Sequence, residues 1–163
     1  LKGHSIYIAA DAHILNIESE TGTTLSHLSD IIIHGDIYAV ETSPVAAINL
    51  LKVSEKRPNI IPILSDANHP ERYQSIVPPV DLIYQDISQR NQADIFTRNI
   101  TAYLKPKGIG LIMVKARSID VALKPKQAYE LVCTHLQQQK LKIKKTFELA
   151  PFEKDHAAIL ITQ

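Results

Sequence analysis

Apolar and polar positions alternate along this chain in blocks that predict buried strands separated by helices. Five short runs rich in β-branched residues are apolar at nearly every position, which is typical of strands covered on both faces of a parallel sheet. These runs are residues 13–17, 36–41, 59–64, 80–86 and 108–115. Residues 43–57 and 91–108 instead carry apolar side chains at spacings of three and four, which predicts helices. The pattern therefore predicts βαβ units with right-handed crossovers.

The pattern changes toward the end of the chain. A predicted helix near 125–139 is followed by two further strand-like runs, 141–149 and 155–162. The segment between these runs is too short for a crossover helix, so the two strands should be antiparallel. We expect an α/β fold with a seven-stranded, mostly parallel sheet, a C-terminal antiparallel hairpin and helices on both faces. At 163 residues, the chain fits a single domain over 1–163.

Charge is balanced overall but uneven along the chain. The whole sequence has 18 basic and 17 acidic side chains, whereas residues 105–145 contain ten basic and two acidic ones. This excess predicts an anion-facing side or, alternatively, a solvated helix face beside an edge strand that lysines protect. Cys133 is the only cysteine, which excludes an internal disulfide and favours a cytosolic or nuclear setting. No apolar run approaches the roughly 20 residues that span a bilayer, and the scattered histidines predict no metal site.

Polar residues follow the predicted parallel strands, at the edge where doubly wound sheets bind their ligands. After the first strand, Gly22 leads into a helix whose N-terminal amides can hold a carboxylate or phosphate. Glu41 ends the second strand, where an acid can accept hydrogen bonds from both hydroxyls of a ribose. Each residue alone could be an ordinary helix cap or turn residue. Together they favour a binding site, because polar groups recur at successive strand ends: Glu41, Asp66 with Ala67, Asp86 with Gln89, and Lys115.

Six motifs in register along nearly the whole chain resemble one protein family. They are "GTTLSHLSD", "IYAVETSP", "NIIPILSDANHPERY", "VDLIYQDISQ", "LIMVKARSID" and "PFEKDHAAI". The family is fibrillarin, the archaeal-type fibrillarin-like rRNA/tRNA 2′-O-methyltransferases of box C/D guide-RNA particles. The resemblance implies a Rossmann-like methyltransferase fold that uses S-adenosyl-L-methionine. It also implies a guide RNA, a target rRNA or tRNA and a Nop-family scaffold protein as partners, in an archaeal cytoplasm or a eukaryotic nucleolus.

The resemblance also implies cofactor contacts for particular residues. The turn before the first helix would meet the methionine end of the cofactor, and the acid after the second strand would meet the ribose. The loop after the third strand would lie on the adenine side, and the loop after the fourth near the sulfonium. The implied contacts, in that order, are Gly22, Thr23 and Thr24; Glu41; Asp66 and Ala67; and Asp86 and Gln89.

A Lys–Asp–Lys–His set surrounds the target hydroxyl in the family, and the resemblance implies that Asp86, Lys115 and His156 are its last three members. The first lysine would fall before Leu1, so we expect a short region upstream of this residue. Lys115 and Arg117 would lie closest to the RNA.

The implied reaction needs help because a ribose hydroxyl holds its proton tightly and is a poor nucleophile. The site must stabilise developing negative charge on the oxygen and orient it in line with the methyl group. Lys115 is the candidate for this task, either as a neutral base or as a fixed positive charge, with Asp86 positioning it. His156 could orient the hydroxyl or a neighbouring phosphate, or it could only satisfy local backbone groups.

The chain departs from the family pattern in the turn after the first strand. The family normally has glycine where Glu18 stands and a small residue where Glu20 stands. A side chain at a glycine position adds steric cost if the backbone is unchanged, and a carboxylate there could repel the carboxylate of the cofactor, although it could also point into solvent. An alternative to an active enzyme is therefore a noncatalytic fibrillarin-like component of the particle with a weakened cofactor site. A less favoured alternative is a methyltransferase of the same fold that modifies another substrate, such as a protein glutamine.

Overall fold

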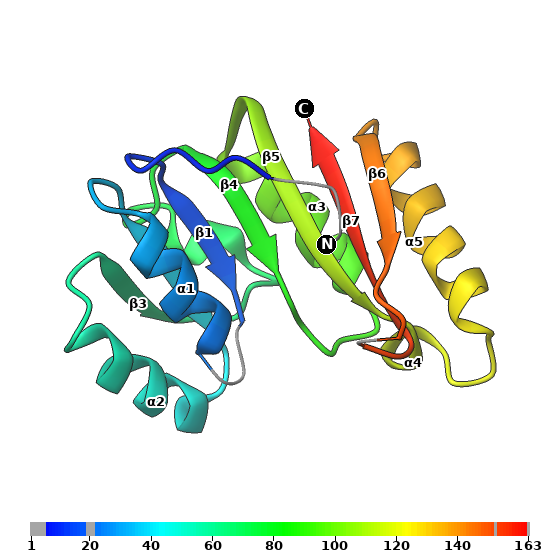
Figure 1. Ribbon diagram of the computed structural model, residues 1–163, viewed down its shortest axis with the longest axis horizontal. Helices are drawn as coiled ribbons and strands as arrows, with labels where there is room; N and C mark the ends of the chain where they lie inside the picture. The colour runs from blue at the N-terminus through cyan, green and yellow to red at the C-terminus, as the bar shows by residue number, and fades with distance from the viewer. Residues whose placement is uncertain (1–5, 19–21, 152, 163) are drawn as a thin grey trace.

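One seven-stranded sheet runs through the computed structural model, which describes residues 6–18, 22–151 and 153–162 (Figure 1). The strand order is β3-β2-β1-β4-β5-β7-β6. β1 to β5 are parallel to one another, whereas β7 is antiparallel to both β5 and β6. The predicted mixed sheet with its C-terminal hairpin is confirmed. The strands are β1 (Ile14–Ile17), β2 (Ile37–Glu41), β3 (Ile60–Leu64), β4 (Val80–Gln85), β5 (Leu104–Lys115), β6 (Lys142–Glu148) and β7 (His156–Thr162).

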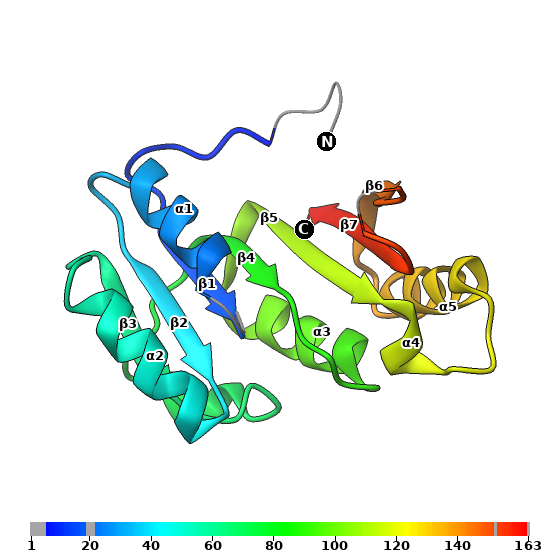
Figure 2. The same ribbon diagram turned by 60° about the horizontal axis from the view of Figure 1, so that its bottom comes forward.

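Helices cover both faces of the sheet (Figures 1 and 2). α1 and α2 pack on one face, and α3 and α5 pack on the other. None of the helices in the described ranges is long and apolar enough to cross a membrane. The helices are α1 (Thr23–Ile31), α2 (Pro44–Ser54), α3 (Gln92–Tyr103), α4 (Ala116–Ile119) and α5 (Pro125–Gln138), and a short 3-10 turn, η1, spans Pro70–Tyr73.

β1 lies at the centre of the parallel region and is buried at all four positions. Its alternating side chains enter two different cores. Ile14 packs with residues of α1, whereas Leu15 and Ile17 join the larger core beneath α3 and α5. Burial on both faces explains why this strand is apolar at nearly every position instead of alternating with polar residues.

The predicted helix over 91–108 was too long at its C-terminal end. α3 stops at Tyr103, and residues from Leu104 onward form the start of β5. Pro106 explains the early end, because proline has no N–H to donate and its ring clashes within a helix. Lys107 has a left-handed backbone (φ 67°), and the pairing of β4 with β5 shifts register here. The other predicted strands agree with the structure to within one residue at either end.

The basic residues of the segment 105–145 do not gather at one end of the strands. Lys105 lies near the start of β5 and pairs with Asp81 (2.9 Å), while Lys115 ends the same strand. These two positions are roughly 30 Å apart at the usual strand rise. Lys142 and Lys144 are exposed on β6, which forms one edge of the sheet. The prediction of a single anion-facing side is therefore wrong. The alternative, an edge strand that lysines protect, fits the lysines of β6.

Gly35 tests the packing of the amino-terminal segment against the sheet. A Cβ at this position would lie 1.9 Å from the Ala12 carbonyl oxygen, which belongs to the backbone and cannot rotate away. We expect Gly35→Ala to destabilise the protein by about 2 kcal/mol or more, as overpacking does. Thermal and urea unfolding would measure the loss. His34→Ala, at the exposed neighbouring position, should change stability little, and equal effects of both variants would contradict this account of Gly35.

Candidate active site

The predicted site residues converge on the edge of the sheet formed by the carboxyl ends of β1, β2, β3, β4 and β5. Parallel strands end on the same side, so their following loops meet there. The structure places all the predicted cofactor and catalytic positions at or just after these ends, while Glu20 lies outside the described residues. The positions are Gly22, Thr23 and Thr24 at the start of α1; Glu41 ending β2; Asp66 and Ala67 after β3; Asp86 and Gln89 after β4; Lys115 ending β5; and His156 opening β7.

The start of α1 depends on the backbone of Gly22. This residue has φ 68° and ψ 1°, a left-handed conformation that glycine adopts without steric penalty. Its carbonyl accepts the Ser26 N–H (2.9 Å), which begins the helical hydrogen bonding. Thr23 and Thr24 follow as the first helical residues, so their amides lie at the positive end of a helix, where an anionic group is favoured.

Tyr84, which sequence reasoning missed, connects the start of α1 with the fourth strand. Its hydroxyl donates to Asp86 Oδ2 (3.5 Å) and also forms a hydrogen bond with the Thr24 side chain. Burial raises the pKa of Tyr84 to about 12, so its phenol keeps its proton. A tyrosine within a buried apolar strand gives no sequence signal for such a role, because it looks like an ordinary core residue.

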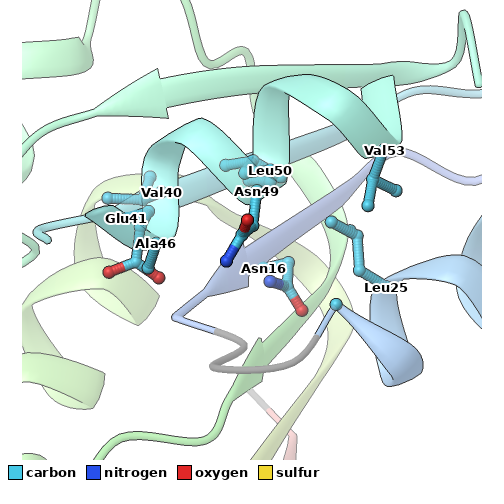
Figure 3. A pocket seen from close by; sticks show the side chains of 10 residues that line it. Asn16, Leu25, Val40, Glu41, Ala46, Asn49, Leu50 and Val53 are labelled. Atoms are coloured by element: carbon cyan, nitrogen blue, oxygen red, sulfur yellow. The ribbon is translucent and has the colours of Figure 1, made fainter. Parts of the chain in front are cut away.

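Glu41 combines helix-start chemistry with a place at the site. Its side chain is only 7% exposed, and Oε1 accepts the Ser43 N–H (2.9 Å) at the entry to α2. It also lies on the rim of a pocket of about 30 Å³, in which Asn16 and Asn49 extend toward one another (Figure 3). This volume suits a water molecule rather than a nucleoside. A nucleoside would therefore not fit inside this pocket.

Asn68 joins the loops that follow β3 and β4. Its backbone N–H and its side-chain Nδ2 both donate to Asp66 Oδ1 (2.9 Å each), and Nδ2 also lies 3.4 Å from Gln89 Oε1. The backbone N–H and then the side chain of Asn68 lower the pKa of Asp66. Ala67 is fully buried, and its carbonyl accepts Asn99 Nδ2 (3.0 Å) from α3. The loop that carries Asp66 is thus held from both sides.

The structure brings the three predicted catalytic residues together. Lys115 Nζ lies 3.1 Å from Asp86 Oδ1 and donates to Ser88 Oγ (3.0 Å). The Lys115 side chain is only 18% exposed, so this charge pair is partly removed from water. His156 lies directly opposite Lys115 in the pairing of β5 with β7.

His156 makes the local backbone contact that the alternative interpretation expected. Its Nδ1 lies 2.7 Å from the Lys154 carbonyl oxygen. A carbonyl can only accept, so Nδ1 carries the proton and Nε2 is the acceptor of the neutral ring. The contact fixes the tautomer and the ring beside Lys115, and a role in orienting a hydroxyl stays compatible with it.

Arg117 lies on α4, two residues after Lys115, the last residue of β5. Its Nε pairs with Asp155 Oδ2 (2.7 Å), and the backbone of Asp155 accepts the Ala116 N–H (2.9 Å). The Arg117 side chain is 78% exposed, so solvent screens this pair strongly. The guanidinium is therefore accessible at the rim of the site.

Glu18 takes a conformation that favours glycine and directs its carboxylate into the site. Its φ is 49°, a left-handed backbone that costs a residue with a Cβ about 1–2 kcal/mol. Oε1 accepts Thr42 Oγ1 (2.9 Å) and lies 3.5 Å from Gln89 Nε2. The carboxylate thus spans the loops after β2 and β4 instead of pointing into solvent. Within the described residues, no group of three His, Cys, Asp or Glu side chains could hold a metal ion.

Comparison with known proteins identifies a family over nearly the whole chain. The family model described as Fibrillarin matches residues 2–163. The fibrillarin-like rRNA/tRNA 2′-O-methyltransferase of Archaeoglobus fulgidus is 45% identical over 159 residues, which cover 98% of this chain and 75% of that protein.

Two solved structures are similar in both fold and sequence. A fibrillarin/Nop5p complex contains a chain that superposes with a TM-score of 0.92 at 43% identity, covering 99% of this chain and 77% of the other. Aeropyrum pernix fibrillarin, in complex with natively bound S-adenosyl-L-methionine, has a TM-score of 0.85 at 41% identity, covering 97% and 70%.

The hydrogen bonds from Asn68 predict how the pKa of Asp66 responds when the Asn68 side chain is removed. We expect Asn68→Ala to raise the pKa of Asp66 toward its ordinary value, because the side-chain hydrogen bond to the carboxylate is lost while the backbone bond is kept. Carboxyl-detected NMR titration would measure the midpoint. Glu71, whose pKa is lowered mainly by its own backbone N–H, serves as an internal control. An unchanged Asp66 midpoint would show that the side chain of Asn68 contributes nothing.

Proposed function

The chain belongs to the fibrillarin family, and from this premise we propose that it methylates the 2′-hydroxyl of a ribose in rRNA or tRNA, using S-adenosyl-L-methionine. The observation that carries this proposal is the convergence of Asp86, Lys115 and His156 at the strand ends where the predicted cofactor-binding residues also lie. The name of the Archaeoglobus fulgidus relative supports the reaction, and the bound ligand of the Aeropyrum pernix structure supports the cofactor.

The residues along this edge fit the different parts of the cofactor. The α1 amides at Thr23 and Thr24 suit a carboxylate, and Glu41 has a second carboxylate oxygen to accept from a ribose hydroxyl. Asp66 and Ala67 form a fixed loop that would hold the adenine side. When bound, S-adenosylmethionine supplies a methyl group on a cationic sulfonium, which is an electrophile.

The protein's task is to make the ribose oxygen reactive and to aim it. The Lys115 ammonium is held between Asp86 and Ser88, so it places a fixed positive charge where negative charge develops on the 2′-oxygen. This geometry favours the fixed-charge role of Lys115 over the role of a neutral base. His156 Nε2, as an acceptor, orients the hydroxyl and takes up its proton as the new oxygen–carbon bond forms and the carbon–sulfur bond breaks.

We further propose that the reaction takes place in a ribonucleoprotein particle. The solved complex of a related fibrillarin with Nop5p supports a scaffold of that kind. A guide RNA paired with the target would then select the nucleotide. Lys115 and the exposed Arg117 would contact the RNA backbone beside the reacting ribose, because cations position phosphates without reading sequence.

Lys115→Ala tests the mechanism. We expect methyl transfer to fall by about 10²- to 10³-fold, the usual effect of removing one charge-stabilising group. Cofactor affinity should stay within a few-fold, because the cofactor contacts lie on other loops. The measurement is single-turnover methylation by the chain assembled with a Nop-family scaffold and a guide–target RNA, together with calorimetric titration of S-adenosylmethionine.

Lys105→Ala is the matched control for this experiment. Lys105 lies on the same strand and also forms an ion pair, but at the opposite end of that strand. Its loss should leave the rate unchanged. Retained turnover in Lys115→Ala would remove Lys115 from the mechanism, and absence of transfer by the unmodified chain would favour the noncatalytic alternative.

Glu18→Gly tests whether the Glu18 carboxylate, which lies between Thr42 and Gln89, opposes cofactor binding. Glycine relieves the left-handed backbone and releases Thr42 and Gln89 from Glu18. We expect S-adenosylmethionine to bind roughly three- to ten-fold more tightly, which corresponds to about 0.6–1.4 kcal/mol. Glu18→Gln keeps the backbone strain and removes only the charge, so calorimetry on both variants separates the two causes. Unchanged or weaker binding to Glu18→Gly would mean that the glutamate fits the bound geometry.

A further inference from the structure

Two glutamines lie completely buried under the catalytic edge. Gln85, the last residue of β4, and Gln92, the first residue of α3, both have no exposed surface. Burying an amide costs free energy unless its N–H and C=O groups are hydrogen-bonded. Both polar side-chain atoms of Gln92 have hydrogen-bond partners, whereas Oε1 of Gln85 has none among the described residues.

Gln92 bonds three parts of the edge together. Its side-chain Nε2 donates to the Gln89 carbonyl (3.1 Å), and its own backbone carbonyl accepts Gln85 Nε2 (2.6 Å). Its side-chain Oε1 accepts the backbone N–H of Lys115 (3.3 Å). One residue thus connects the end of β4, the loop that follows it and the end of β5.

The contact with Lys115 replaces a backbone hydrogen bond that β4 is too short to provide. The paired residues of β4 and β5 end at Gln85 and Ile112, three residues before Lys115. At Lys115, the side of β5 that faces β4 therefore has no strand to bond its backbone. The amide of Gln92 accepts the Lys115 N–H there, while Asp86 and Ser88 hold the ammonium at the other end of the same residue.

We propose that Gln92 is a positioning residue for methyl transfer, because it fixes the backbone of Lys115 so that the ammonium stays beside Asp86 and the reacting hydroxyl. This inference rests on the proposed methyltransferase function. Gln92 does not touch the reacting atoms and acts through Lys115. Its loss should lower the rate of the chemical step while leaving cofactor affinity unchanged.

Gln92→Met is the variant that tests this role, since methionine is unbranched, of similar length and apolar. In the assembled particle we expect single-turnover methylation to fall about ten-fold, equivalent to about 1.4 kcal/mol. The Kd of S-adenosylmethionine should remain within two-fold in a parallel titration. Asn59→Leu serves as the control for lost stability, because Asn59 also makes amide hydrogen bonds, to Ser29 and Ile32, but away from the site. It should transfer methyl groups at the full rate.

A double-mutant cycle with Lys115→Ala separates positioning from general loosening of the fold. If Gln92 acts through Lys115, then Gln92→Met causes little further loss in the Lys115→Ala background. Additive losses, or a full rate in Gln92→Met alone, would overturn the inference while the unmodified chain and Asn59→Leu still report methyl transfer. Absence of transfer in the unmodified chain would overturn the proposed function and this inference together.

Discussion

The common direction of β1 to β5 is the constraint on which the site depends. Each of these strands delivers its following loop to the same edge, so residues far apart in the sequence become neighbours without any long-range contact designed for each pair. The cores on both faces hold the strands in this arrangement. The polar edge is therefore only as well ordered as the apolar layers beneath it.

Contacts between adjacent loops then make this edge rigid. Thr42 meets Glu18, Asn68 joins Asp66 to Gln89, and the ammonium of Lys115 meets Asp86. The contacts of Thr42 with Glu18, Asn68 with Gln89 and Lys115 with Asp86 each cross from one strand end to another. A reaction that requires an oxygen, a methyl carbon and a leaving sulfur in line benefits from such order, because misplacement by an ångström can reduce a rate greatly.

Much of the fold and site could be predicted from the sequence, because parallel buried strands leave a near-continuous apolar signal and their ends are easily located. Gln85, Gln92 and Tyr84 could not be found this way. Their roles come from partners brought close by folding, as when Lys115 meets Gln92 across 23 positions of sequence. The end of α3 was missed because the helical spacing of apolar residues continued past Tyr103, although Pro106 indicated that the helix ends before it. The prediction of an anion-facing side failed because the lysines of one strand, β5, lie near both of its ends.

Glu18 shows how a local departure can coexist with an unchanged fold. Its backbone has φ 49°, a conformation that glycine adopts without steric penalty, while the chain superposes on a fibrillarin chain with a TM-score of 0.92. The printed contacts of the Glu18 side chain lie with the loops after β2 and β4, outside the strands themselves. Ligand affinity and stability can change there independently of the core.

The two edge strands limit how the protein can join others. β6 presents lysines along its outer side, and β3 carries Pro62, which has no N–H to offer a neighbouring chain. Neither edge is suited to extend the sheet by pairing with a strand from another molecule. We therefore expect a protein partner to contact side chains on helices and loops, which would leave the backbone hydrogen bonds of the sheet unchanged.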